Sequence, residues 1–448
     1  MADAATKTLY IKTYGCQMNL YDSERMADVM KPFGYEMTAE YENADMVILN
    51  TCHIRERAAE KVYSELGRLN DEKKRQRKQG KSMMIAIAGC VGQAEGEQIF
   101  KRAPYVDMVV GPQSYQSLPD LVSKIKRDSG HAIDLTLTHD KFDQLPEATT
   151  VAANGSACVS IQEGCDKFCT FCVVPYTRGA EYSRPVADIY RECLGRAAHG
   201  GIEMTLLGQN VNAFHGLAPD GTAWDLGKLI THVATIPGIE RIRYSTSHPK
   251  DMHESLYLAH GREPKLMPFL NLPIQSGSNR ILQAMNRKHT REQYFTIIER
   301  LRKERPDMQF SSDFIIGFPG ETQSDFDDTM DLAQKVGFVQ AYSFTYSPRP
   351  GTPGAEMKDQ IDEAVKNKRL QTFQQLINGQ QLAFNESCAG KIMDIIPDRP
   401  GKREGQMIGR SPYMQSVYVR DLPEDSIGKL VTVKIIHGYA NSLEGEVV

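Results

Sequence analysis

The chain has 448 residues, more than one ordinary domain holds, and we predict two or three domains. Its 41% hydrophobic and 25% charged residues exclude wholesale disorder and fibrous repeats, and its net charge of -4 excludes a histone-like polycation. No apolar run reaches the roughly 20 residues that span a bilayer, and the first residues lack a signal-peptide core. We therefore expect a cytoplasmic protein without a membrane partner.

The first block of the chain, residues 7–124, alternates strand and helix patterns. Strands are predicted at 8–14, 46–49, 83–88 and 106–110, with helices over about 20–30 and 53–69. This alternation is typical of a doubly wound parallel sheet in an α/β protein. A basic run at 73–81 is predicted to be a solvated helix end and loop between elements, with contact to RNA phosphates as the alternative.

A polar stretch at 134–154 has few apolar anchors and predicts a linker. The second block, with domain bounds of 145–384, repeats the alternation of strands and helices. Its strands are predicted near 157–162, 202–207, 240–246, 266–273, 309–316 and 339–345. Six such units are fewer than the eight of a closed barrel, so we expect a partial (βα)6 barrel whose chemistry lies at the carboxyl ends of the strands.

The third block, residues 387–448, consists of short β-type segments joined by Asn and Gly, and it predicts a small all-β barrel. Lys plus Arg and Asp plus Glu balance within residues 401–448. Charge alone therefore does not mark this block as an RNA-binding domain.

The nine cysteines are the feature that composition does not explain. An odd number without an export signal argues against a disulfide framework. Cys165, Cys169 and Cys172 follow the first strand of the second block at the spacing CxxxCxxC. Three thiolates on one loop can hold three irons of a 4Fe–4S cube and leave the fourth iron open to a substrate or cofactor. A zinc site is the weaker alternative, because structural zinc normally recruits four protein ligands.

Three further cysteines, Cys16, Cys52 and Cys90, each come a residue or two after a predicted strand of the first block. Because parallel strands end at one edge of their sheet, these thiols are expected to meet there, where open α/β sheets bind ligands. The pattern predicts a second three-cysteine cluster. The remaining cysteines are predicted to be packing residues: Cys158, Cys193 and Cys388.

The cysteine loop on this kind of barrel resembles the radical S-adenosylmethionine enzymes. The resemblance implies that the amino and carboxylate groups of S-adenosylmethionine bind the open iron, and that an electron from the cluster cleaves it to a 5′-deoxyadenosyl radical. Polar residues at strand ends and one glycine turn are the candidates for binding S-adenosylmethionine: Gln209, Asn210, Ser245, Gln275 and Gly317.

Local motifs throughout the chain resemble the methylthiotransferase family, and its tRNA branch most closely. The motifs are YGCQMN at 14–19, NTC at 50–52, GC at 89–90, CDKFCTFCVVPYTRG at 165–179, LGQNV at 207–211, QSGS at 275–278 and DFIIGFPGET at 313–322. The tail, with Gly438 and Gly445, is similar to a TRAM domain, a β-barrel associated with RNA binding. One departure is Asn271, where relatives usually carry His; an amide cannot titrate, so an acid–base role at this position is in doubt.

The resemblance implies that N6-isopentenyladenosine beside the anticodon of tRNA is converted to its 2-methylthio derivative. It further implies two 4Fe–4S clusters, S-adenosylmethionine, a sulfur donor and an electron donor such as a flavodoxin-type reductant. The tail residues that could contact tRNA, or alternatively are only solvated, are Arg410, Tyr413, Lys434 and His437.

Three alternative functions remain open at this point. Two are the family branches that modify threonylcarbamoyladenosine in tRNA or an aspartate of a ribosomal protein, because they share the domain order. The third is a noncatalytic RNA-binding protein with structural zinc.

Overall fold

The structure, a computed structural model, describes residues 6–52, 56–128, 130–143, 145–146 and 154–448. The chain divides into two compact units. The first contains Met1–Thr150, Glu163–Cys165 and Val173–Tyr182, and the second contains Val151–Gln162, Asp166–Cys172 and Ser183–Val448. Of the helices described, none has the length and apolar character that a bilayer crossing requires.

The first unit contains a six-stranded parallel sheet with the strand order β2-β1-β3-β4-β5-β6. Its strands are β1 (Lys7–Tyr14), β2 (Tyr35–Met37), β3 (Met46–Thr51), β4 (Met84–Gly89), β5 (Met108–Val110) and β6 (Ala132–Asp134). The four predicted strands are present. The two edge strands β2 and β6 were not predicted, because three residues are too few to produce a periodic pattern.

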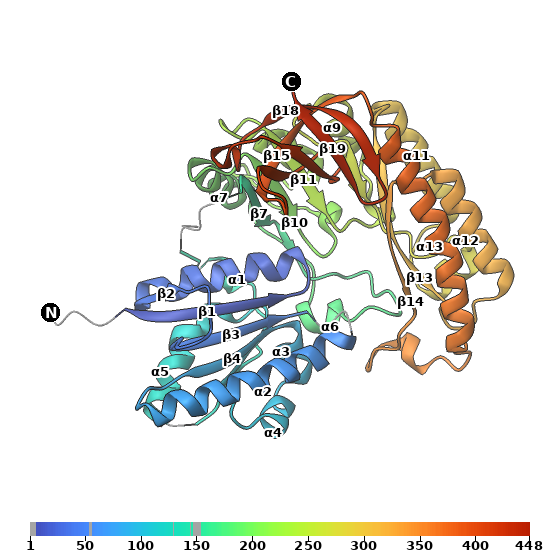
Figure 1. The fold of residues 1–448 in the computed structure, drawn as a ribbon. Coiled ribbons are helices and arrows are strands. Elements are labelled where there is room, and N and C mark those ends of the chain that lie inside the picture. The colour runs from blue at the N-terminus through green and yellow to red at the C-terminus, as the bar shows by residue number, and fades with distance from the viewer. Residues whose placement is uncertain (1–5, 53–55, 129, 144, 147–153) are drawn as a thin grey trace. The chain divides into compact units, whose positions relative to one another are not determined.

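Helices cover both faces of this sheet, as predicted for a doubly wound fold (Figure 1). On one face, α1 (Gln17–Met30) and α5 (Leu118–Asp128) share a core with Ile48. On the other, α2 (Glu56–Lys78) and α4 (Gln98–Arg102) share a core with Val47. Successive residues of β3 thus enter opposite cores, which is why the strand is apolar throughout.

The basic run is a helix end followed by a loop, as predicted, but the helix is longer than the predicted 53–69, because α2 continues to Lys78. Lys73 pairs with Asp107 at 2.5 Å, so at least one of its charges is neutralised. The polar stretch after residue 134 is not merely a linker, because Lys141 is fully buried. The predicted helix start at 53 and the stretch 147–153 lie outside the described residues.

The second unit contains two three-stranded parallel sheets. The first is ordered β7 (Ser156–Ser160), β10 (Glu203–Leu207), β11 (Arg241–Ser245), and the second β12 (Phe269–Asn271), β13 (Gln309–Ile316), β14 (Gln340–Thr345). A parallel bridge between Ile242 and Leu266 continues one sheet toward the other. The six strands follow one another in chain order, which agrees with the predicted partial (βα)6 barrel.

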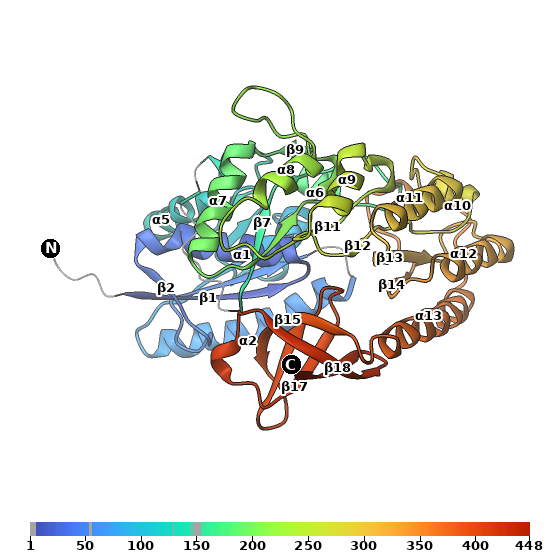
Figure 2. The same cartoon turned by 90° about the horizontal axis from the view of Figure 1, so that it is seen from above.

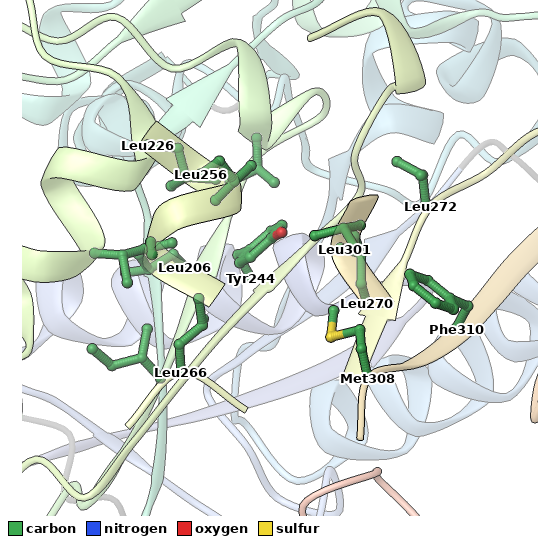
Figure 3. Packing of buried hydrophobic residues seen from close by; sticks show 14 of the residues in the cluster. Leu206, Leu226, Tyr244, Leu256, Leu266, Leu270, Leu272, Leu301, Met308 and Phe310 are labelled. Atoms are coloured by element: carbon green, nitrogen blue, oxygen red, sulfur yellow. The ribbon is translucent and has the colours of Figure 1, made fainter. Parts of the chain in front are cut away.

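One face of these strands packs on helices and forms the main core, part of which Figure 3 shows. Leu206, Tyr244, Leu270 and Phe310 are among the residues of this outer face. The helices that enclose it are α7 (Val186–Ala198), α8 (Leu226–Val233), α9 (Glu254–Arg262), α11 (Arg291–Glu304), α12 (Gln323–Val336) and α13 (Glu363–Glu386). Because side chains alternate along a strand, the intervening residues point to the opposite side, which we call the inner face.

A closed five-stranded barrel follows α13 (Figure 2). Its strands are β15 (Ile392–Pro400), β16 (Gln406–Arg410), β17 (Ser416–Arg420), β18 (Val431–Tyr439) and β19 (Ser442–Val447). Ile395, Val417, Val433 and Leu443 fill its interior. This all-β tail agrees with the prediction.

Two arginines at the amino ends of the inner face hold the small barrel in place. Arg243 donates to Glu203 at 2.8 Å, and its other nitrogens donate to the carbonyl oxygens of Ser411 and Pro412. Arg241 donates to the carbonyls of two further barrel residues, Asp394 and Arg410. All three charged side chains are buried, so their hydrogen bonds replace lost hydration.

We predict that Arg243→Leu destabilises this attachment. The variant leaves Glu203 with the Ser156 hydroxyl and the more distant Arg241, at 3.8 Å, and removes the Arg243 donors from two carbonyl groups. Breaking a buried ion pair costs about 3 kcal/mol, measured as a lower midpoint of urea unfolding. Faster hydrogen exchange in residues 392–447 should accompany it. The control is Arg262→Leu at an exposed position, and equal midpoints for both variants would contradict the prediction.

Candidate metal centre and cofactor site

The structure brings Cys16, Cys52 and Cys90 to one edge of the first sheet. In the ladder, Tyr14 of β1 lies opposite Thr51 of β3, and Thr51 lies opposite Gly89 of β4. Each cysteine follows its member of this row by one or two residues. The alignment of parallel strand ends is therefore what assembles the three thiols.

The thiol of Cys52 lies within hydrogen-bonding reach of the other two thiols. Cys52 hydrogen-bonds with both Cys16 and Cys90, and these bonds lower the pKa of each of the two partners to about 6. The positive charge of Arg178 also lowers both values, whereas the pKa of Cys52 is raised by its two neighbours. The site thus favours thiolates at Cys16 and Cys90, the form of cysteine that binds metal.

Buried amides support this edge from behind. Cys16 donates through Sγ to Oδ1 of Asn19 at 3.2 Å, and Asn19 donates to Asn50 at the end of β3. Asn50 in turn donates to the backbone of Asn19 and to Ser23 at 2.9 Å. These side chains are almost fully buried, so the loop that carries Cys16 is fixed to the strand that precedes Cys52.

A buried ionic network lies beside the same thiols, and sequence reasoning did not find it. Arg178 pairs with Asp22 at 2.7 Å and with Glu163 at 2.9 Å, and Lys141 pairs with Glu163 at 2.6 Å. Burial raises the pKa of Asp22 to about 6, although Arg178 acts in the opposite direction. The network holds the Arg178 guanidinium near Cys90.

The second triplet lies on the loop between β8 (Gln162–Glu163) and α6 (Val174–Arg178). Gly164, at φ +73°, lies so close to the Ala180 carbonyl that a Cβ would be 1.9 Å from its oxygen. The Cys165 amide donates to the Gly179 carbonyl, and the Cys172 amide donates to the Cys169 carbonyl. These bonds give the loop a defined backbone.

Arg287 is a functional candidate that the cysteine spacing could not reveal. Its Nη1 donates to Sγ of Cys169 at 3.4 Å, across a sequence separation of 118 residues. The guanidinium is buried, and its Nε has no hydrogen-bond partner in the part of the chain that the structure describes. A buried donor in contact with a candidate ligand sulfur is the kind of outer-shell partner that orients metal ligands.

The donor chemistry of both triplets fits an iron–sulfur cube. In the described part of the chain, no three His, Cys, Asp or Glu side chains are arranged to hold one metal ion. A 4Fe–4S cube does not require that convergence, because each thiolate binds a different iron. All nine cysteines are free thiols, which leaves both triplets available.

The candidates for binding S-adenosylmethionine all lie at the carboxyl ends of the barrel strands. Asn210 follows β10, Ser245 ends β11, Gln275 follows β12 and Gly317 follows β13, while Gln209 precedes Asn210. At Gly317 the close neighbour is Lys366, whose Cγ would be 2.2 Å from a Cβ. At Gln275 the backbone is left-handed, with φ +79°, a strained conformation typical of functional sites.

Orphaned polar atoms at this end of the barrel fit a polar ligand. Each is buried and has no hydrogen-bond partner among the described residues: Asn210 Oδ1, Ser160 Oγ, Ser247 Oγ and His248 Nε2. Burial, with the nearby charge of Arg287, lowers the pKa of His248 far below its ordinary value, so this ring is neutral. A buried polar atom without a hydrogen-bond partner costs folding free energy unless a ligand or a water molecule supplies that partner. S-adenosylmethionine, with its amino, carboxylate, hydroxyl and adenine groups, could do so.

The four tail residues proposed for RNA contact fall into two pairs. Tyr413 packs edge-on against Phe384 of α13, and Arg410 donates to Ser416 at 3.0 Å, so both have structural partners. Lys434 and His437 are exposed on β18. The second pair is therefore better placed for contact with RNA.

Comparison with known families divides the chain into three parts. Residues 8–111 match the uncharacterized protein family UPF0004, residues 159–333 the radical SAM superfamily, and residues 386–448 the TRAM domain. The partial barrel and the small β-barrel described above occupy the second and third ranges.

Relatives match over nearly the whole chain. A tRNA-2-methylthio-N(6)-dimethylallyladenosine synthase of Rickettsia felis is 59% identical over 99% of this chain and 100% of its own. One from Wolbachia pipientis is 60% identical over 98% and 99%. In fold, the chain resembles the radical S-adenosylmethionine enzymes TsrM of Kitasatospora setae (TM-score 0.57, 13% identity, 79% of this chain and 74% of that one) and OxsB (0.53, 13%, 84% and 56%).

We predict that Gly89→Ala disrupts the edge that carries Cys90. A Cβ at Gly89 would lie 2.4 Å from Oδ1 of Asn50 and 2.8 Å from the Thr51 carbonyl oxygen. The control is Gly34→Ala, which has a similar φ (+79° against +83°) and no atom within 4 Å of its Cβ. Gly34→Ala should cost about 1 kcal/mol for its left-handed backbone (ψ 21°). Gly89→Ala should cost more, because of these contacts and because the ψ of -158° at Gly89 is almost confined to glycine. Equal losses in thermal unfolding would contradict the prediction.

Proposed function

Because the chain belongs to the family of tRNA-2-methylthio-N(6)-dimethylallyladenosine synthases, radical S-adenosylmethionine methylthiotransferases that act on tRNA, we propose that its two cysteine triplets hold two 4Fe–4S clusters. The chain is a tRNA methylthiotransferase that converts N6-isopentenyladenosine to its 2-methylthio derivative. The branches that modify threonylcarbamoyladenosine or a ribosomal protein, and the zinc-protein alternative, are therefore not retained.

In this proposal Cys165, Cys169 and Cys172 hold the cluster whose open iron binds S-adenosylmethionine, and the first triplet holds the auxiliary cluster. The single observation that carries it is the alignment of Cys16, Cys52 and Cys90 at one strand edge. When bound, the clusters and S-adenosylmethionine supply the one-electron chemistry and the sulfur insertion.

The chain's own residues bind and orient these groups. Arg287 donates to the sulfur of Cys169, and Arg178 places a positive charge near Cys90, so a buried cation lies beside each triplet and would help to orient its ligands. Asn210 and Gln275, with Gln209, Ser245 and Gly317 on the same rim, would hold the polar groups of S-adenosylmethionine.

We further propose domain bounds of 7–124, 145–384 and 387–448. Lys434 and His437 would contact tRNA on the exposed face of β18. The reaction also requires a sulfur donor and an electron donor, for which a flavodoxin-type reductant is suited, and a cytoplasmic location agrees with both needs.

Substitutions in the two cysteine triplets are expected to affect different steps of the reaction. Cys169→Ala should abolish cleavage of S-adenosylmethionine, measured as loss of 5′-deoxyadenosine. Cys52→Ala should retain that cleavage and lose methylthiolation, measured by nucleoside mass spectrometry. Cys193→Ala, a buried residue of the main core, is the control and should retain both. Methylthiolation retained by Cys52→Ala would remove the first triplet from the reaction.

Metal content and a deletion strain test the proposal independently. Purified anaerobically, the protein should contain about eight irons, the number in two 4Fe–4S clusters. A colourless zinc protein would contradict the cluster assignment. The tRNA of a deletion strain should lack the methylthio group on isopentenyladenosine, and an unchanged nucleoside profile would contradict the substrate.

A further inference from the structure

The inner face of the second barrel sheet carries a row of residues whose role the reaction described above leaves open. Ladder pairing places Asn271 of β12 opposite Ser311 of β13, and Asp313 of β13 opposite Tyr342 of β14. Ile315 likewise lies opposite Phe344. Their neighbours Phe310 and Phe314 belong to the helix-covered core, so this row faces the other way.

Asp313 is a carboxylate positioned by its neighbours. The side-chain amide of Asn271 donates to the Ser311 hydroxyl at 2.9 Å and is 3.5 Å from Oδ1 of Asp313. Burial raises the pKa of Asp313, and the amide of Asn271 and the charge of Arg287 act in the opposite direction. Asn271 can therefore orient the Asp313 carboxylate through a hydrogen bond, a role that does not require a titratable side chain. The carboxyl group retains capacity to accept another hydrogen bond.

Two aromatic side chains beside this carboxylate are exposed to solvent. Tyr342 is 47% and Phe344 45% exposed, although both lie on a strand of the barrel. In the described residues, β14 pairs with β13 alone, so its other edge is free. A cavity of about 240 Å³ lies along this edge, lined by Tyr342, Phe344 and residues of α13 such as Ile377. Exposed rings with an adjoining cavity indicate a binding site for an apolar, planar group.

The helix that lines this cavity leads to the exposed face of the small barrel. Asn385, eight residues after Ile377, donates to the Tyr439 carbonyl at 2.7 Å. Eight helical residues span about 12 Å, roughly two nucleotides of an RNA strand. His437 packs edge-on against Tyr439 at 4.3 Å on β18. One strand of RNA could therefore contact β18 and insert a base at the free edge of β14.

We propose that Asp313, Tyr342 and Phe344 bind the target adenine, with the rings stacking on the base and its isopentenyl group and the carboxylate accepting a hydrogen bond from N6–H. A base in this position must leave its stack in the RNA loop, and aromatic stacking offsets that cost. The assignment rests on the proposed function and adds the residues that recognise its substrate.

The adenine of S-adenosylmethionine is a competing occupant of this site. Asn210, Ser245 and Gly317 lie at or beyond the carboxyl ends of their strands, whereas Asp313 comes three residues before β13 ends at Ile316. Gln275 lies at the level of Asp313, because its backbone N–H donates to the Asp313 carbonyl. The affinity for S-adenosylmethionine, measured below, therefore decides between the two occupants.

Binding of two modified RNA hairpins to the full, cluster-containing protein tests the inference. One hairpin carries N6-isopentenyladenosine, and the other carries N6-methyl-N6-isopentenyladenosine, which has no N6–H. The wild type should bind the first about tenfold more tightly, the effect of one hydrogen bond to a charged group. Asp313→Leu should bind both equally, and Asp313→Asn, which keeps an acceptor, should retain part of the preference. Asp327→Asn, at an exposed position of α12, is the control.

Leucine substitutions test the aromatic pair. Tyr342→Leu and Phe344→Leu should each weaken binding of the isopentenyl hairpin about tenfold, whereas Phe33→Leu, at an exposed ring of the first unit, should not. A preference for N6–H that survives in Asp313→Leu would overturn the proposal. So would a loss of S-adenosylmethionine affinity in that variant, because it would assign Asp313 to the cofactor. Methylthio product formed by the wild type, measured separately, distinguishes either failure from a failure of the proposed function.

Discussion

Parallel strands must all end at the same edge of their sheet, and the placement of the chemistry in this molecule depends on that constraint. In the first unit it aligns Tyr14, Thr51 and Gly89 and so brings together three cysteines from distant parts of the chain. In the second unit it gathers the polar residues after β10, β11 and β12 at one rim. Neither site needs a loop long enough to reach across the molecule.

The same constraint explains what could be predicted from sequence. Strand–helix alternation and cysteine position suffice to infer the sheets and both triplets, because a strand end is a local feature. Arg287 and Lys141 could not be predicted, because a buried cation is identified only by partners distant in sequence. Asp313 lies within the motif at 313–322, but its position opposite Tyr342 is known only from the strand register. The end of α2 was misjudged because charged residues occur equally in a solvated helix and in a loop.

Buried arginines recur at each important junction of the structure. Arg178 lies between two carboxylates beside the first triplet, Arg287 contacts Cys169, and Arg243 joins Glu203 to the small barrel. Burying a guanidinium costs several kcal/mol unless its donors are satisfied, so each must be placed by specific partners. This requirement fixes the geometry around both cysteine triplets at the cost of stability, which suits the two clusters proposed for them.

The inner face of the barrel therefore has an ordered arrangement from one end to the other. Arg241 and Arg243 occupy its amino end, where carbonyls of the small barrel cover them. The orphaned polar atoms and Cys169 occupy its carboxyl end. Access for a nucleobase is then left to the side, at the unpaired edge of β14 where Tyr342 and Phe344 are exposed. In the proposed arrangement, the small barrel that Arg241 and Arg243 attach to these strands would hold the substrate loop beside this edge.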